Sequence, residues 1–236
     1  MNIVNFPNAQ AVFVHDDTAS QGVAVAQRIA ALAAEAIAAR GVCRIALAGG
    51  ETPRRCYEAL CGLAIDWARV QLYFGDERCL PSGDAQRNDS MVRDSLLEHI
   101  AIPPANVHRI PAELGAREAA ARYTVETGNA YPLDIVLLGM GEDGHTASLF
   151  PGNPATELAA AVVPVFDAPK PPPERVSLGM GTLNAARRKI FLVAGASKRE
   201  ALERILRREA LPAARITAAE WHLDRTALPI NDDNKR

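Results

Sequence analysis

The stretch LDIVLLGMGEDGHTASLFP, residues Leu133–Pro151, decides the fold of this chain. It opens with an apolar run, Ile135–Leu138, that has the character of a buried strand. The strand is predicted to end at a glycine-rich loop, Gly139–Thr146. In open α/β sheets the ligand crevice lies just outside the carboxyl ends of the strands. The stretch therefore predicts an α/β fold with a binding loop at the end of this strand.

His145 and Asp143 lie in this loop and are the first candidates for chemistry. A free imidazole has a pKa of about 6.5, so near neutral pH it can accept a proton, and a neighbouring carboxylate can orient its ring. We therefore predict that His145 is a general base and that Asp143 supports it. The alternative is a tight structural turn without a chemical role, because turns also collect glycine and aspartate.

The same loop matches the pattern G-x-G-x-x-G at Gly139, Gly141 and Gly144. A dinucleotide site needs a continuous helix after the last glycine and an acidic residue about 20 positions later. Asp167 stands near that place, but the sequence Pro151-Gly152-Asn153-Pro154 interrupts any such helix. We therefore set the dinucleotide interpretation aside.

The composition is that of an ordinary soluble globular protein, with 48% hydrophobic and 23% charged residues. A length of 236 residues suits a single α/β domain, and we expect one domain over residues 1–236. The formal net charge of −2 gives no general attraction to nucleic acid or to a membrane surface. The most apolar helical segment, Val23–Ala39, contains Arg28 and Glu35, so we do not expect it to cross a membrane.

The N-terminal residues Met1–His15 have no signal-peptide pattern. Without such a signal, cysteines that lack C-x-x-C spacing are expected to be free thiols. The cysteines are Cys43, Cys56, Cys61 and Cys79. We therefore expect a cytoplasmic protein.

Predicted strands and helices alternate along the chain, as a mostly parallel sheet with helices on both faces requires. The predicted strands are Arg44–Ala48, Val70–Phe74, Leu133–Leu138, Arg175–Met180 and Ile190–Ala194. The predicted helices are Thr18–Arg40, Pro53–Leu60 with Thr52 as its N-cap, Ser90–Ile100, Arg117–Thr127 and Ser197–Arg208. The proline run Pro169–Pro173 is expected to be an extended connector, and Asn231–Arg236 a frayed tail.

The segment Gly49–Pro53 joins a predicted strand to a predicted helix. Backbone N–H groups at a helix N-terminus favour a phosphate, so Gly49, Gly50 and Thr52 are candidate phosphate ligands. A plain turn is the alternative, because the loop lacks the ending of a Walker P-loop. Arg175 and Lys198 would supply the matching positive charge, although either residue alone is more typical of a solvated surface.

Asp76, Glu77 and Arg78 place three charges at the end of an apolar strand. One interpretation is a structural ion-pair cluster. The functional interpretation is an arginine that binds an anionic or carbonyl oxygen, with the acids holding sugar hydroxyls or the arginine itself.

Other catalytic classes find no support in the sequence. The histidines at positions 15, 99, 108 and 222 have no comparable surroundings, and we expect surface or capping roles for them. There is no metal-ligand spacing of the H-E-x-x-H type and no G-x-S-x-G elbow, so we predict neither a catalytic metal nor a serine nucleophile.

Four sequence blocks together resemble the 6-phosphogluconolactonase family over essentially the whole chain. Gly49–Pro53 is similar to a GGSTP loop, and Asp76–Pro81 with Asn88 to a DERxVP…N block. Gly139–Pro151 matches the signature GMGxDGHTASLFP nearly residue for residue. The last block, an RxTL element followed by a GxxK element, is matched by Arg175–Leu178 and Gly195–Lys198.

The resemblance implies a Rossmann-like α/β fold of the glucosamine-6-phosphate deaminase and ribose-5-phosphate isomerase type. It also implies hydrolysis of a small-molecule substrate, 6-phosphogluconolactone, without a cofactor, by a monomer or weak dimer. His145 would activate water with help from Asp143, and the amides around Gly141 and Gly144, with Arg78, would stabilise the oxyanion.

The resemblance assigns the remaining candidates to substrate binding. These residues are Gly49, Gly50, Thr52, Asp76, Glu77, Asn88, Arg175 and Lys198. Two positions depart from the family pattern. Glu51 replaces the usual serine, and we expect its carboxylate to point away from the phosphate loop; Asp89 replaces a common tyrosine.

Two alternative functions would need residues that this chain lacks. A glucosamine-6-phosphate deaminase-isomerase would need an acid after the DGH motif and an aromatic residue after the Asp-Glu pair, whereas this chain has Ala147–Pro151 and Arg78. A sugar-phosphate-sensing domain without turnover would need a DNA-binding element, and Met1–Phe13 is too short and not basic.

Overall fold

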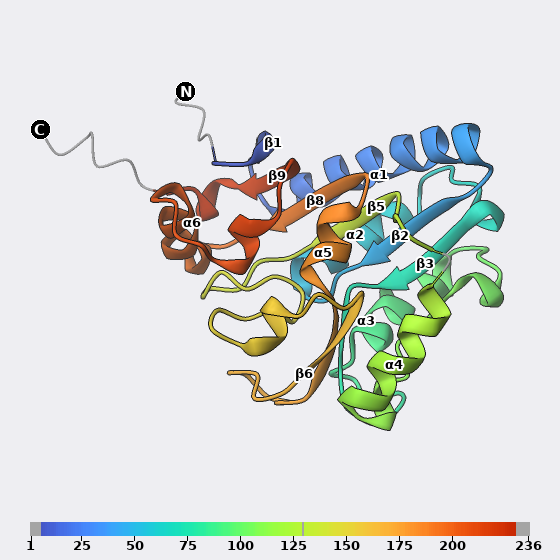
Figure 1. Ribbon diagram of the computed structural model, residues 1–236. Coiled ribbons are helices and arrows are strands. Elements are labelled where there is room, and N and C mark those ends of the chain that lie inside the picture. Colours follow the sequence, from blue (N-terminus) through green and yellow to red (C-terminus); the bar gives the residue numbers. More distant parts are fainter. Residues whose placement is uncertain (1–5, 129, 230–236) are drawn as a thin grey trace, which may run out of the picture.

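The computed structural model describes residues 6–128 and 130–229. Its main element is a six-stranded parallel sheet in the order β1-β9-β8-β5-β2-β3 (Figure 1). The strands are β1 (Ala9–His15), β2 (Cys43–Leu47), β3 (Val70–Phe74), β5 (Ile135–Leu138), β8 (Arg188–Val193) and β9 (Ala219–Asp224). The predicted mostly parallel α/β fold is confirmed.

The sheet has a topological switch point between β2 and β5. From β2 the chain moves outward to β3, and from β5 it moves in the opposite direction to β8 and β9. Ile45 of β2 pairs with Ile135 of β5 across this point. Ligands of open α/β sheets bind outside the carboxyl ends of the two strands at such a point. The loops after β2 and β5 are therefore the expected site.

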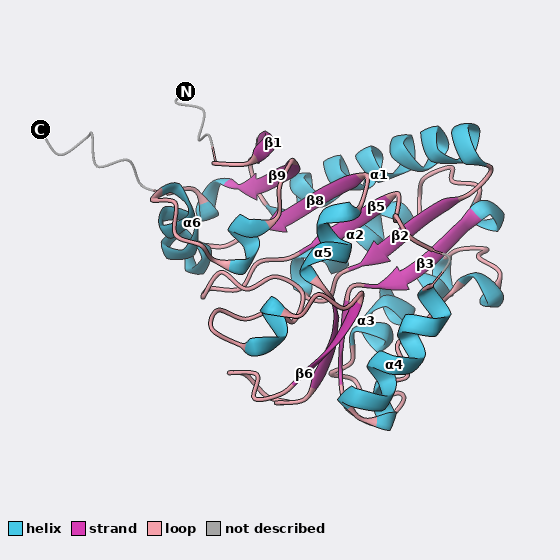
Figure 2. Cartoon of the chain, viewed as in Figure 1, coloured by secondary structure: helices cyan, strands magenta, loops and turns pink. Residues whose placement is uncertain are grey.

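A second, antiparallel sheet stands beside the first, in the order β4-β7-β6. Its strands are β4 (Asp76–Arg78), β6 (Val162–Val165) and β7 (Arg175–Leu178). Figure 2 shows these strands below the carboxyl edge of the parallel sheet. Asp76–Arg78, which follows the predicted strand Val70–Phe74, forms a strand of its own and pairs with β7.

The helices are α1 (Thr18–Arg40), α2 (Glu51–Leu60), α3 (Asn88–Ser95), α4 (Ala116–Thr127), α5 (Met180–Ala185) and α6 (Arg199–Leu206). Figure 1 shows α1 running behind the parallel sheet and α5 in front of it. The first helix has its predicted bounds, Thr18–Arg40, with Asp17 as its N-cap and Gly41 as its C-cap. Thr52 is not an N-cap, because Gly50, at φ 107°, is the N-cap and the helix begins at Glu51.

Helix α1 is long and apolar enough to span a membrane by length and composition. Its apolar stripe, formed by Val25, Ile29, Leu32 and Ala36, is buried in the core. This burial is typical of a helix that covers the core of a folded domain.

Strands β1 and β9 were not predicted, and neither was the burial of His222 in β9. All six residues of β9 are buried, including Glu220, His222 and Asp224. Because these three side chains are polar, the sequence does not show the hydrophobic pattern of a core strand. The chain compensates with specific partners: Arg28 pairs with Glu220, and the ring of His15 hydrogen-bonds that of His222. The expected frayed tail, Asn231–Arg236, lies outside the described residues.

Candidate active site

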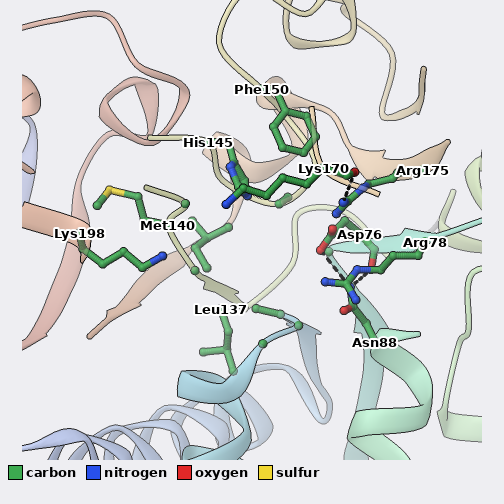
Figure 3. A pocket seen from close by; sticks show the side chains of 18 of the residues that line it. Asp76, Arg78, Asn88, Leu137, Met140, His145, Phe150, Lys170, Arg175 and Lys198 are labelled. Carbon is green, nitrogen blue, oxygen red and sulfur yellow. Dashed lines mark hydrogen bonds between the residues drawn. The ribbon is translucent and has the colours of Figure 1, made fainter. Parts of the chain in front are cut away.

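A cavity of about 320 Å³ opens at the carboxyl ends of β2, β3 and β5, where the switch point predicts a site (Figure 3). Its size is at the lower end of the range for small-molecule pockets. The predicted residues that line it are Gly49, Gly50, Asp76, Arg78, Asn88, Gly141, His145, Arg175 and Lys198. Thr52, Glu77, Asp143 and Gly144 are not among the lining residues.

His145 and Asp143 form a close pair at the rim of this cavity. Nδ1 of His145 lies 2.5 Å from Oδ1 of Asp143, which also accepts a hydrogen bond from the His145 backbone. Burial opposes ionisation of Asp143, but these hydrogen bonds and the imidazole charge outweigh burial and lower the pKa of Asp143 to about 2. An ionised Asp143 accepts the Nδ1 proton, so the lone pair of His145 is assigned to Nε2.

Gly141 leaves the space that this pair occupies. A Cβ atom at position 141 would lie 2.1 Å from Nδ1 of His145 and 2.5 Å from Oδ1 of Asp143. The imidazole ring also packs against Phe150, with 4.5 Å between ring centroids and a tilt of 46°. The base therefore contacts both the glycine turn and an aromatic ring.

The amides of Gly141 and Gly144, expected to stabilise the oxyanion, are hydrogen-bonded within the loop. The N–H of Gly141 donates to the carbonyl of His145 at 2.9 Å, and that of Gly144 donates to the carbonyl of Gly141 at 3.1 Å. Both donors are consumed in forming the turn that presents His145. The oxyanion role expected for these two amides therefore finds no support in this geometry, because glycines in a loop this tight satisfy one another's backbone groups.

Arg78, Asp76 and Asn88 form the wall of the cavity away from His145 (Figure 3). The Asp76 carboxylate accepts a 2.6 Å hydrogen bond from Ser148, and Asn88 donates to the Asp76 carbonyl at 2.8 Å. Arg78 donates one N–H to the carbonyl of Gln86, while its buried Nε has no partner among the described residues. The Asp76 carboxylate is thus hydrogen-bonded within the protein, whereas the Arg78 guanidinium has N–H groups left that can donate to a ligand.

Glu77 points into the protein instead of toward the cavity. Its carboxylate accepts hydrogen bonds from the backbone N–H groups of Arg78, Asn88 and Asp89, at 2.7 to 2.8 Å. Burial raises the pKa of Glu77 to about 7, although these hydrogen bonds act in the opposite direction. The structure therefore does not bring Glu77 to the substrate; this side chain joins β4 to the beginning of α3.

The amino end of α2 faces the cavity through Gly49 and Gly50. A Cβ atom at Gly49 would lie 1.9 Å from Oδ1 of Asn88, so only glycine allows this approach. The Glu51 side chain is 66% exposed and lies 3.4 Å from Arg55, so it points away from the loop as expected. The first N–H groups of α2 have no intrahelical partners and favour an anion.

Three cationic side chains also line this cavity: Arg175, Lys198 and Lys170. Arg175 is buried, and its Nε and Nη2 donate to the carbonyls of residues 170 to 172. Burial lowers the pKa values of Arg175 and of Lys198. Lys170 was not predicted to be a site residue, because it lies in the proline run Pro169–Pro173, which was expected to be a connector. A lysine within the proline run just before Arg175 was the available signal.

Within the described part of the chain, no group of three or more His, Cys, Asp or Glu side chains is placed to hold a metal ion.

The fold and the site place the chain in a known family. Residues 16–225 match the model of the glucosamine-6-phosphate isomerases/6-phosphogluconolactonase family, and the chain belongs to it.

Relatives and solved structures agree with this assignment. The chain is 40% identical to a 6-phosphogluconolactonase of Synechocystis over 75% of this chain and 77% of the relative. It is 36% identical to that of Rattus norvegicus over 89% of both chains. The crystal structure of 6-phosphogluconolactonase from Thermotoga maritima superposes with a TM-score of 0.85 at 27% identity, covering 91% of this chain and 99% of that one. A monomeric glucosamine-6-phosphate deaminase, with a TM-score of 0.81 at 22% identity over 92% and 98% of the two chains, shows the shared fold alone.

Proposed function

We propose that this protein hydrolyses 6-phospho-D-glucono-1,5-lactone to 6-phospho-D-gluconate, the lactonase step of the oxidative pentose phosphate pathway. The observation that carries the proposal is a base and an anion site in one cavity. The His145–Asp143 pair lies at one end, and the amino end of α2 with Arg175 and Lys198 provides the anion site. Relatives at 36 to 40% identity that carry the lactonase name support the same substrate.

His145 takes a proton from water at Nε2, and the water oxygen attacks C1 of the lactone. The carbonyl electron pair moves to the exocyclic oxygen. When the tetrahedral intermediate collapses, the bond from C1 to the ring oxygen breaks and His145 returns the proton to that oxygen. The resulting acid releases its own proton to solvent. Asp143 keeps the imidazole in the required tautomer and stabilises its protonated form.

The 6-phosphate binds at the free N–H groups of α2 and at Lys198 and the remaining Nη1 of Arg175. Arg78 and Asn88 bind sugar oxygens from the opposite wall. Direct substrate roles for Asp76 and Glu77 find less support, because both carboxylates are occupied by protein donors.

A direct test makes the unstable lactone in place with glucose-6-phosphate dehydrogenase and follows its disappearance with and without the protein. Acceleration above spontaneous hydrolysis is expected. The same protein is then incubated with glucosamine-6-phosphate, and no ammonia is expected. Ammonia release without lactone acceleration would replace the proposal with deamination.

Deamination is the second candidate because the fold is shared with a deaminase. Its chemistry needs a further acid for ring opening. In this chain Ser148 donates to Asp76, and Leu149 and Phe150 are buried apolar side chains. A non-catalytic sensing role is disfavoured by the intact His145–Asp143 pair.

We further propose that the protein is cytoplasmic, uses no cofactor, binds neither nucleic acid nor membranes, and is a monomer or weak dimer.

A further inference from the structure

The proposed reaction needs a positive group or an N–H donor at the lactone carbonyl, where negative charge develops. The two glycine amides expected there are hydrogen-bonded within their own turn. Figure 3 shows Arg78 beside Asn88 and Asp76, on the wall away from His145. The residues assigned from the sequence therefore leave the reacting end without a dedicated donor.

Lys170 starts beside Arg175, and its side chain extends across the cavity toward His145. Figure 3 shows its side chain extended away from Arg175 toward His145 and Lys198. The amino end of α2, which favours the phosphate, lies across the cavity from His145 in the same view. Lys170 forms no ion pair with an acidic side chain of the described residues.

The charge of Lys170 acts on Lys198, which lines the same cavity. Burial lowers the pKa of Lys198 most; the charge of Lys170 lowers it further, and Glu142 and Asp143 raise it. Lys170 and Lys198 thus line one cavity and influence each other's charge. Two lysines that repel each other in a cavity fit a site that receives negative charge from its ligand.

The loop that carries Lys170 is held in place by the protein. We define residues 168–173, between β6 and β7, as the strap. The N–H of Ala168 donates to the carbonyl of Pro173 at 3.0 Å and closes the strap. Arg175 donates to the carbonyls of Lys170, Pro171 and Pro172, at 2.9 to 3.2 Å, and its guanidinium lies over the ring of Phe150. Phe150 also packs against His145, so the same aromatic ring contacts the proposed base and the arginine that holds the strap.

We propose that Lys170 is a catalytic residue whose ammonium group stabilises the oxyanion formed at C1 of the lactone, and that Arg175 positions it through the strap. The proposal rests on the proposed function and adds a residue to it. As water attacks C1, the carbonyl electron pair moves to the exocyclic oxygen and Lys170 donates an N–H to that oxygen. On collapse, the electron pair returns to form the carboxyl group and the ring C–O bond breaks.

The test compares Lys170→Met, Lys170→Arg and Lys198→Met with two substrates, the 6-phosphorylated lactone and unphosphorylated gluconolactone. Lys170→Met is expected to lower kcat by about 10²–10³ on both substrates, the scale of losing one oxyanion donor. Lys170→Arg keeps the charge and is expected to restore at least one tenth of the wild-type kcat. Lys198→Met is expected to act mainly on KM for the phosphorylated lactone. Arg122→Met, which removes an exposed cation of α4, is the control and should retain wild-type kinetics.

The possible results distinguish the oxyanion role of Lys170 from the proposed lactonase function. Loss of activity toward the phosphorylated lactone alone, through KM, would assign Lys170 to the phosphate and overturn the oxyanion role. A wild-type kcat in Lys170→Met would also overturn it. Failure of the wild-type protein to accelerate lactone hydrolysis would instead contradict the proposed function.

Discussion

At the residue scale, the account depends on the lone pair of His145. His145→Ala is expected to lower kcat by about 10²–10⁴, the contribution of a positioned general base. Steady-state kinetics with the phosphorylated lactone measure the loss, and the circular dichroism spectrum and melting curve check that the variant folds. A folded variant with near wild-type turnover would remove His145 from the mechanism.

Gly141 offers a second test of the same pair. In Gly141→Ala the new methyl group would meet His145 and Asp143 at 2.1 and 2.5 Å, so the pair must move. We expect kcat to fall at least about tenfold, since small displacements of catalytic groups carry costs of this order or more. Gly181→Ala in α5, where a Cβ atom meets nothing within 4 Å, is the matched control. Equal kinetics in both variants would argue against a close His145–Asp143 pair.

The glycines and His145 of the loop could be predicted from the sequence, because the residue types themselves indicate a tight turn and a proton acceptor. The use of Gly141 and Gly144 amides inside the turn could not, because it depends on backbone geometry. Lys170 was missed for a related reason: only the folded strap brings it to the cavity.

At the element scale, the strap links Arg175 to both binding and turnover. Arg175→Lys keeps a positive charge but cannot reproduce the planar set of donors to three carbonyls. We expect KM for the phosphorylated lactone to rise and kcat to fall on both lactones, because Lys170 is displaced. A rise in KM with unchanged kcat would show that Arg175 contacts phosphate without positioning the strap.

The contact between β1 and β9 should make stability depend on pH. Burial and the charge of neighbouring His15 lower the pKa of His222 to about 4, while Glu220 opposes this and Arg28 adds to it. In the unfolded chain His222 titrates near 6.5, so it binds more protons there than in the folded chain between pH 4 and 6.5. Stability is therefore lost as the pH falls through this window.

His222→Phe removes this titration and keeps an aromatic ring against Phe13, which stacks on His222. We expect the fall in Tm from pH 7 to pH 5 to be smaller in the variant than in the wild type. Thermal unfolding followed by circular dichroism at both pH values measures it. An equal or larger fall in the variant would contradict the assignment.

Elements with clear hydrophobic patterns were predicted from sequence: β3 with its observed bounds, and β2, β5 and β8 within a few residues. Strand β9 was missed because buried Glu220, His222 and Asp224 resemble surface residues until their partners are known. The start of α2 was misplaced because Gly50 adopts a positive φ that a capping rule based on Thr52 does not anticipate.

At the scale of the whole molecule, the order of the strands explains why distant sequence blocks form one site. The switch point between β2 and β5 brings the α2 loop and the His145 loop together, and the small antiparallel sheet adds Arg78 and Arg175. The motifs predicted which blocks matter, but only the topology defines their arrangement. The single-domain organisation over residues 1–236 stays a prediction.

Activity is expected to survive exhaustive dialysis against EDTA, because the described residues provide no cluster suited to a catalytic metal and His145 can activate water directly. The coupled lactone assay before and after dialysis measures this. Loss of turnover that one divalent cation restores would show that a metal takes part.

The most direct test of the central claim is the decay of enzymatically generated 6-phosphogluconolactone, followed by real-time NMR with the wild-type protein and with His145→Ala. The account predicts rapid conversion to 6-phosphogluconate by the wild type and decay near the spontaneous rate with the variant. Decay at the spontaneous rate with folded wild-type protein would contradict the account.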